Sequence, residues 1–179
     1  MRSIEVTVKG IVPLLQHRFT DNNEVSGESV TRIKSGKKKQ SDPEDYLYKL
    51  SNGKTYQPAI HFEGSMIKAA GNFQIPGRGK KTYKDLFKAA VFVVPETIIH
   101  KHQAWIVDSR SVVNPTTGGR QMCKRPRFDE WELDFVIEVH DDQLQDEAVK
   151  DILEYAGKYV GVGAYRPRFG RFMVTKFKA

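Results

Sequence analysis

The alternation of apolar and polar side chains over residues 131–139 (WELDFVIEV), broken only at Val136, is the feature that most constrains the fold. A period of two places every second side chain on one face, which is typical of a half-buried strand. Residues 3–12 (SIEVTVKGIV) show the same alternation. The positions expected to face the core are Ile4, Val6, Val8, Trp131, Leu133, Phe135, Ile137 and Val139.

Two further stretches have helical periodicity. Residues 60–73 and residues 143–160 each place apolar side chains on one helical face. Those positions are Phe62, Met66, Ile67, Ala70 and Phe73 in the first stretch, and Leu144, Ala148, Ile152, Leu153, Ala156 and Val160 in the second. Strands are expected over 91–100, 104–113 and 171–177, with a hairpin around the turn at 51–53 and a short helix over 83–90.

This order of elements gives two β-α-β halves. The sequence therefore predicts an α+β, ferredoxin-like (RRM-like) antiparallel sheet with helices on one face and basic loop insertions. The length of 179 residues and the 39% hydrophobic content suit one domain over 1–179. The chief insertion is a basic loop at about 20–45.

Cysteine content excludes two classes of small protein. Cys123 is the single cysteine in the sequence, so neither a disulfide framework nor a four-cysteine zinc site can form.

No apolar run approaches the roughly 18 residues of a membrane span, and the alternating N-terminus does not resemble a signal peptide. We expect a cytoplasmic protein with no cofactor, no metal and no membrane partner.

Charge is segregated along the chain. The net charge is +7, yet residues 129–160 hold eleven acidic and two basic residues, a local charge of −9, which leaves +16 for the remainder. An extended positive field favours a polyanionic partner, and nucleic acid is the common one. The alternative is a basic protein that has one acidic helix and no such ligand. The acidic helix itself is explained either by helix capping or by contact with a neighbouring subunit.

Three connections concentrate the positive charge. They are the loop at 20–45, the segment 76–81 (PGRGKK) and the glycine- and arginine-rich connection at 114–128. Long polar loops in compact domains tend to be functional or disordered. The basic residues of the first and third connections include Lys37, Lys38, Lys39, Arg120, Lys124, Arg125 and Arg127.

The most specific segment is 161–171 (GVGAYRPRFGR). Glycines at 161, 163 and 170 permit positive φ and close approach of the backbone to a ligand, while backbone amides can hold phosphate oxygens. Three arginines would add charge and two aromatic rings could stack on bases. Solvated arginines on a tight connection are the alternative. In a dinucleotide-binding fold the glycines follow a strand and precede a helix, whereas here they follow a helix and precede a strand.

This final segment resembles the C-terminal glycine-rich loop of the RAMP superfamily, which includes CRISPR effector backbone subunits and CRISPR RNA-processing endonucleases. Residues 56–68 (YQPAIHFEGSMIK) are similar to the start of the family's first helix, with His61 where small residues are usual. The expected first strand and its PLLQHRF continuation are also similar to the family's N-terminal strand. The resemblance implies a ferredoxin-like domain that grips RNA along its backbone, with copies polymerising along the strand.

The histidines raise the possibility of catalysis. His17 follows the first strand, where some RAMP-type endoribonucleases keep a general base, and Arg18 or Lys68 could supply the cation for the phosphate. A binding or surface histidine is the alternative. His100 and His102 lie one residue apart on an expected strand and could form half a metal site, but a third ligand is not evident. Trp105 fits either a core position or a stacking platform.

We therefore predict a non-enzymatic protein that binds single-stranded nucleic acid, RNA rather than DNA, as several copies along a strand in a CRISPR-type ribonucleoprotein. The expected phosphate contacts are Arg18, Lys37, Lys38, Lys39, Lys68, Arg166, Arg168 and Arg171, followed by Arg120, Lys124, Arg125 and Arg127, with Tyr165 and Phe169 as stacking residues. The alternatives are a phage-type single-stranded DNA-binding protein, a metal-independent endoribonuclease using His17, and a protein-interaction module that mimics a CRISPR subunit.

Overall fold

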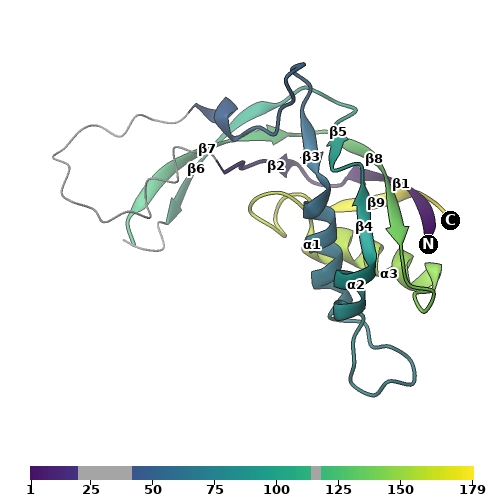
Figure 1. Cartoon of the computed structure of the whole chain (residues 1–179). Helices are drawn as coiled ribbons and strands as arrows, with labels where there is room; N and C mark the ends of the chain where they lie inside the picture. The colour runs from purple at the N-terminus through teal and green to yellow at the C-terminus, as the bar shows by residue number, and fades with distance from the viewer. Residues whose placement is uncertain (20–41, 114–117) are drawn as a thin grey trace, which may run out of the picture.

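A four-stranded antiparallel sheet forms the centre of the molecule (Figure 1). The computed structural model describes residues 1–19, 42–113 and 118–179. The sheet consists of β4 (Val91–Val94), β8 (Glu132–Val139), β1 (Arg2–Gly10) and β9 (Phe172–Lys178), in that spatial order. The α1 helix (Ala59–Ala70) and the α3 helix (Asp146–Tyr155) lie on one side of it, and α2 (Lys84–Ala90) packs beside α1.

The α+β class and the antiparallel sheet are thus confirmed. The chain order β1-α1-β4-β8-α3-β9 and the spatial strand order are consistent with a ferredoxin-like fold. The register explains the sequence alternation, because Val6 lies opposite Phe135 and Val8 opposite Leu133, all facing the helices. Within the resulting core, the Phe62 ring of α1 lies 4.6 Å from Phe135 of β8, centroid to centroid.

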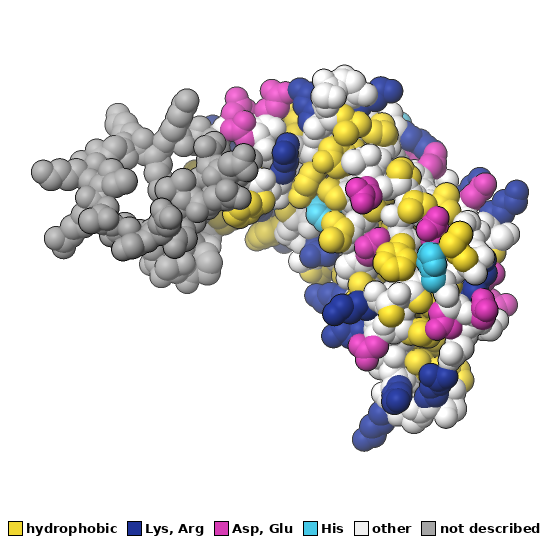
Figure 2. All heavy atoms as spheres, in the orientation of Figure 1, with side chains coloured by type: hydrophobic (Ala, Val, Ile, Leu, Met, Phe, Trp, Pro, Cys, Tyr) yellow, Lys and Arg dark blue, Asp and Glu magenta, His cyan; other side chains and the backbone are white. Residues whose placement is uncertain are grey.

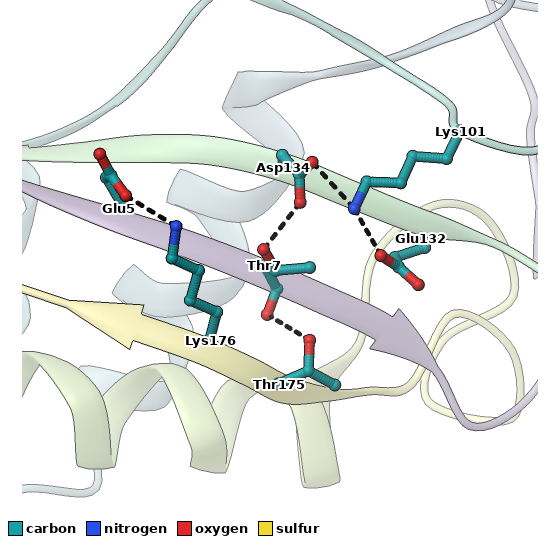
Figure 3. Close-up of polar contacts among 7 residues, drawn as sticks. All are labelled: Glu5, Thr7, Lys101, Glu132, Asp134, Thr175 and Lys176. Atoms are coloured by element: carbon teal, nitrogen blue, oxygen red, sulfur yellow. Dashed lines mark hydrogen bonds and ion pairs between the residues drawn. The ribbon is translucent and has the colours of Figure 1, made fainter.

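The opposite face of the sheet carries a ladder of paired polar groups (Figure 3). Lys176 Nζ lies 2.7 Å from Glu5 Oε2, and Lys101 Nζ lies 2.8 Å from Asp134 Oδ2. Thr7 Oγ1 donates to Asp134 Oδ1 at 2.7 Å. This face, called the charge ladder below, comprises Glu5, Thr7, Lys101, Glu132, Asp134, Thr175 and Lys176. Because its charges compensate one another, it presents no net positive surface to a polyanion.

A second sheet of three strands extends away from the first, with two long strands that form a ribbon and one short strand beside them (Figure 1). It contains β2 (Leu14–Leu15), β7 (Arg120–Phe128) and β6 (Ile106–Val113), in that order, while β3 (Tyr56–Pro58) pairs with β5 (Thr97–Ile99) separately. The expected connection at 114–128 is therefore mostly strand. Its polar composition suggested a loop, yet β6 supplies a backbone partner for every residue from 120 to 127.

The second long helix ends differently from the expectation. Residues 146–155 are α-helical, and a single π-helical turn (Ala156–Val160) completes the element. Val149, rather than the expected Ala148, is fully buried with Ile152 and Leu153. Gly157 lies against β9, and a Cβ there would overlap the carbonyl oxygen of Phe172.

The insertion at about 20–45 lies mainly outside the described residues. Its described end begins a short 3₁₀ helix (Pro43–Tyr46), capped by the Asp42 side chain, which accepts from the Glu44 N–H at 3.0 Å. Among the helices in the described ranges, none is long and apolar enough to cross a membrane.

We predict that two glycine substitutions change stability in opposite directions. Gly157→Ala forces a methyl group into the backbone of β9 and should lower the free energy of unfolding by about 1–3 kcal/mol. Gly64→Ala is the matched control, because a Cβ at this exposed position on α1 meets nothing within 4 Å. It should raise stability by about 0.5–1 kcal/mol through helix propensity. Urea denaturation measures both, and equal midpoints for the two variants would contradict the packing described at Gly157.

Candidate nucleic-acid interface

The glycine-rich loop over residues 161–171 approaches other backbone segments too closely for side chains. Gly161, Gly163 and Gly170 have φ values of 74°, 76° and 73°. A Cβ at Gly163 would contact the Leu15 carbonyl, and one at Gly170 would overlap the Val162 carbonyl. The glycines therefore serve the folding of the loop itself, since both the positive φ and the close approach exclude larger residues.

Hydrogen bonds fix this loop to two elements. The Ala164 N–H donates to Leu15 O at 2.8 Å, and the Gly170 N–H donates to Pro13 O at 2.9 Å. From α1, the buried Ser65 hydroxyl donates to Gly161 O at 2.9 Å. The base of the loop is thus clamped between the β1–β2 connection and α1, and its tip projects into solvent.

The tip presents the groups that phosphate and base recognition require. Tyr165 is 52% exposed, and Arg166 and Arg168 are exposed and form no ion pair with any described residue. Unpaired guanidinium groups on a fixed backbone are suited to phosphate oxygens, and an exposed ring can stack on a base.

Phe169 occupies a different place from the one expected for a stacking residue. It is 6% exposed, and the Arg110 guanidinium lies 4.5 Å from its ring centroid. In this arrangement its ring supports the loop and Arg110, so it is not a free platform for a base. Arg171 is half-buried, and its Nε has no hydrogen-bond partner among the described residues.

A strip of aromatic and basic side chains adjoins the loop. His17 stacks on Tyr46 with ring centroids 4.6 Å apart, and Arg125 Nε of β7 donates to His17 Nδ1 at 3.3 Å. Burial, followed by the positive charge of Arg125, lowers the pKa of His17. Arg18 follows His17, and its N–H donates to Tyr46 O at 2.9 Å.

The strip continues toward the first turn of α1. The His61 ring lies 5.4 Å from Tyr48, edge to face, and its Nδ1 contacts the Gln57 side-chain amide. Burial and the charge of Arg166 lower the pKa of His61 to about 4. Figure 2 shows Lys and Arg side chains gathered beside α1.

Buried polar side chains form hydrogen bonds to the backbone that carries the strip. Gln16 is fully buried, donates to Tyr56 O at 2.8 Å and accepts from the Tyr48 N–H at 3.0 Å. Its amide also lies 3.3 Å from Nε2 of His100, which is 1% exposed and stacks on Phe128. These bonds fix the backbone that carries Tyr48.

The remaining predicted residues are scattered. Lys68 is exposed on α1, whereas Arg120 and Lys124 lie on the ribbon face opposite to Arg125, as the alternation of β7 requires. Arg127 pairs with Asp129 at 2.6 Å, so an acidic neighbour already compensates its charge. Lys37, Lys38 and Lys39 lie outside the described residues.

The loop tip does not include the remaining aromatic and histidine candidates. His100 is buried while His102 is exposed, so the two do not present a common metal site. Trp105 is partly buried and lines a cavity of about 300 Å³ with His102, Arg127 and Asp129.

Sequence reasoning missed four residues of the site. Tyr46 ends the short 3₁₀ helix and Tyr48 lies two residues later, in a segment that the sequence predicted only as part of a hairpin. Arg110 lies on a strand with no motif around it. His61 was noticed solely as a departure from the family pattern. The sequence did contain a signal for the two tyrosines, because Tyr46 and Tyr48 alternate directly after the basic insertion.

The fold has counterparts among solved structures. A chain in the cryo-EM structure of the type III-B Cmr-beta bound to cognate target RNA superposes with a TM-score of 0.57 at 12% identity. The match covers 98% of this chain and 59% of that one, so this chain spans about three fifths of the chain it matches. The crystal structure of Cmr6 from Pyrococcus furiosus matches over 96% of this chain and 97% of that chain, with a TM-score of 0.46 and 13% identity.

The likeness to the Cmr-beta chain shows a shared fold. No protein-family model and no curated protein matches the sequence.

We predict that stability falls as His61 and His100 are protonated. Burial, and after it the charge of Arg166 for His61 and of His102 for His100, lowers the pKa of each to about 4. An unfolded histidine titrates near 6.5, so the unfolded chain binds protons first as the pH falls. The stabilisation is therefore complete above about pH 6.5 and is lost progressively toward pH 4, by up to about 1.4 kcal/mol per pH unit for each group.

Urea midpoints at pH 7.5, 6.5, 5.5 and 4.5 measure this loss. His100→Gln should flatten the dependence, because it removes one of the two groups whose pKa is lowered. The same dependence in wild type and His100→Gln would show that His100 does not contribute.

Proposed function

We propose that this protein binds single-stranded RNA along its backbone as a subunit of a CRISPR-type ribonucleoprotein. The observation that carries the proposal is the loop tip, where Tyr165, Arg166 and Arg168 are exposed and neither arginine forms an ion pair with a described residue, on a base clamped to β2 and α1. A rigid base holds the arginines in position before the ligand arrives, which reduces the entropy lost on binding.

The neighbouring strip extends the contact. Arg18, Arg125 and the His17–Tyr46 stack border the tip, so a strand would meet cations for its phosphates and rings for its bases. The charge ladder covers the face of the sheet on which an RRM carries its stacking residues. We therefore place the strand along the edge of the fold, between α1 and the ribbon.

Two further features favour an RNA-binding RAMP relative. The matched Cmr-beta chain comes from a structure bound to cognate target RNA, which favours RNA over DNA. The ferredoxin-like order of the central sheet agrees with the sequence resemblance. We also propose that several copies line one strand, with the acidic α3 of one copy facing basic side chains of the next.

The endoribonuclease alternative gains little from the geometry of His17. Because Arg125 Nε–H donates to Nδ1, the neutral ring carries its proton on Nε2. Neither nitrogen then has a free lone pair, which a general base for the 2′-hydroxyl needs.

We predict that Arg166→Ala with Arg168→Ala weakens binding to single-stranded RNA and makes it less sensitive to salt. Two lost phosphate contacts should reduce the slope of log K against log salt by about 1.4, at about 0.7 per contact for single strands. Fluorescence anisotropy of a labelled oligonucleotide between 50 and 200 mM salt measures the slope. The control is Lys9→Ala with Lys178→Ala, which removes equal charge from exposed positions on the ladder face.

Two results of this experiment would contradict the proposal. One is an equal effect of both double variants, which would indicate a diffuse field without a site. The other is an absence of gel shift with RNA or DNA at low salt, together with the 260/280 nm absorbance ratio of pure protein, which would favour a protein-interaction module. Preference for DNA over RNA of the same length and sequence would favour the phage-type alternative.

We predict that the protein binds RNA without cleaving it. A dual-labelled RNA should remain intact over hours with wild type and with His17→Ala, on a denaturing gel. Metal-free cleavage by wild type that His17→Ala abolishes would establish the endoribonuclease alternative instead.

A further inference from the structure

The connection between α1 and α2 forms an ordered basic turn at the far end of α1 (Figure 1). The Ile75 N–H donates to Lys81 O at 2.9 Å, and the Arg78 N–H donates to Ile75 O at 3.1 Å. Gly77 and Gly79 have φ values of 74° and 62°, conformations that favour glycine. The backbone of the turn is thus specified, although the side chains from residue 76 to 81 are all exposed and bury nothing.

Positive charge gathers on this turn and its flanks without compensation. Residues 68–88 hold six basic side chains and a single acidic one, Asp85. None of the six forms an ion pair with the residues that the structure describes. The six are Lys68, Arg78, Lys80, Lys81, Lys84 and Lys88. Figure 2 shows Lys and Arg side chains at the tip of this connection. Mutual repulsion disfavours such a cluster unless an anionic ligand offsets it.

Aromatic side chains link the turn to the glycine-rich loop. Phe73, at the base of the turn, lies edge to face with Tyr155, whose ring centroid is 4.6 Å from that of Tyr159. Tyr159 is 52% exposed, Lys158 Nζ lies 5.2 Å from its ring centroid, and Gly161 begins the loop two residues later. Aromatic rings therefore connect the base of the turn to the start of the glycine-rich loop.

We infer that the turn at 74–82 is a second contact for the nucleic-acid backbone, which extends the binding surface along the length of α1. The inference rests on the proposed function and adds a site to it. The α1 helix, which carries the turn at its C-terminal end, has 12 residues and is about 18 Å long. At about 3.4 Å per stacked nucleotide that span corresponds to roughly five nucleotides. A strand of only a few nucleotides can occupy one contact, whereas a longer one engages both.

The test compares oligonucleotide lengths in the variant Arg78→Ala, Lys80→Ala, Lys81→Ala. The turn should persist, because its internal hydrogen bonds join backbone groups and the variant removes only the bond from the Arg78 side chain to Gln143. Thermal denaturation checks this. We expect binding of a 4-nucleotide RNA to be unchanged within twofold. Binding of a 20-nucleotide RNA should weaken at least tenfold, with a salt slope lower by about 2 for three lost contacts.

Two matched proteins complete the experiment. The triple variant Lys9→Ala, Lys176→Ala, Lys178→Ala removes the same charge from the ladder face and should leave both affinities near wild type. The variant Arg78→Lys, Lys80→Arg, Lys81→Arg keeps the charge and should restore binding of the 20-nucleotide RNA.

The possible results separate this inference from the proposed function. If the 20-nucleotide RNA binds wild type and the alanine variant equally, the second contact is refuted while the proposed function stands. An equal loss for both lengths, or an equal loss in the ladder-face control, would also refute it, because a general field would then explain the effect. If wild type binds no strand at any length, both proposals fall together.

Discussion

The close approach of Gly163 and Gly170 to the carbonyl oxygens of Leu15 and Val162 is the constraint on which the rest of the interface depends. It forces one chain path for residues 161–171 and brings the end of β2 beneath the loop. The Ser65 hydroxyl then joins α1 to the same loop. Three segments distant in sequence therefore meet at a point where the backbone has almost no conformational freedom. The backbone at this junction sets the orientation of the arginines in the loop.

Two surfaces of the molecule differ in whether their basic side chains form ion pairs. On the ladder face, lysines lie against glutamate and aspartate of neighbouring strands, so the surface is close to neutral although it is rich in ions. Beside α1 and on its connection to α2, basic side chains have no such partners among the described residues. Pairing, more than the number of charges, decides which face can attract an anion.

Sequence patterns predicted the layers of the fold but not the contacts of the site. The alternation over 131–139 and 3–12 was sufficient for the central sheet, because burial on one face leaves a period of two. The strand at 120–128 was mistaken for a loop, since an exposed ribbon has no apolar face to reveal it. Phe169 looked like a stacking residue because its burial depends on Arg110, about 60 positions away in the sequence. Similarly, the stacking of Tyr46 on His17 across an insertion is a tertiary contact that local spacing does not encode.

The neutral ladder has a consequence for how a ligand arrives. One broad face is close to neutral, and the uncompensated cations of the described residues lie beside α1 and on its connection to α2. If a nucleic-acid strand binds there as proposed, this uneven distribution of charge would orient the protein before contact. Encounters would then be productive in a larger fraction of collisions, and added salt would slow association as well as weaken the complex. The ion pairs of the charge ladder would thus affect the rate of binding at a surface that they do not contact.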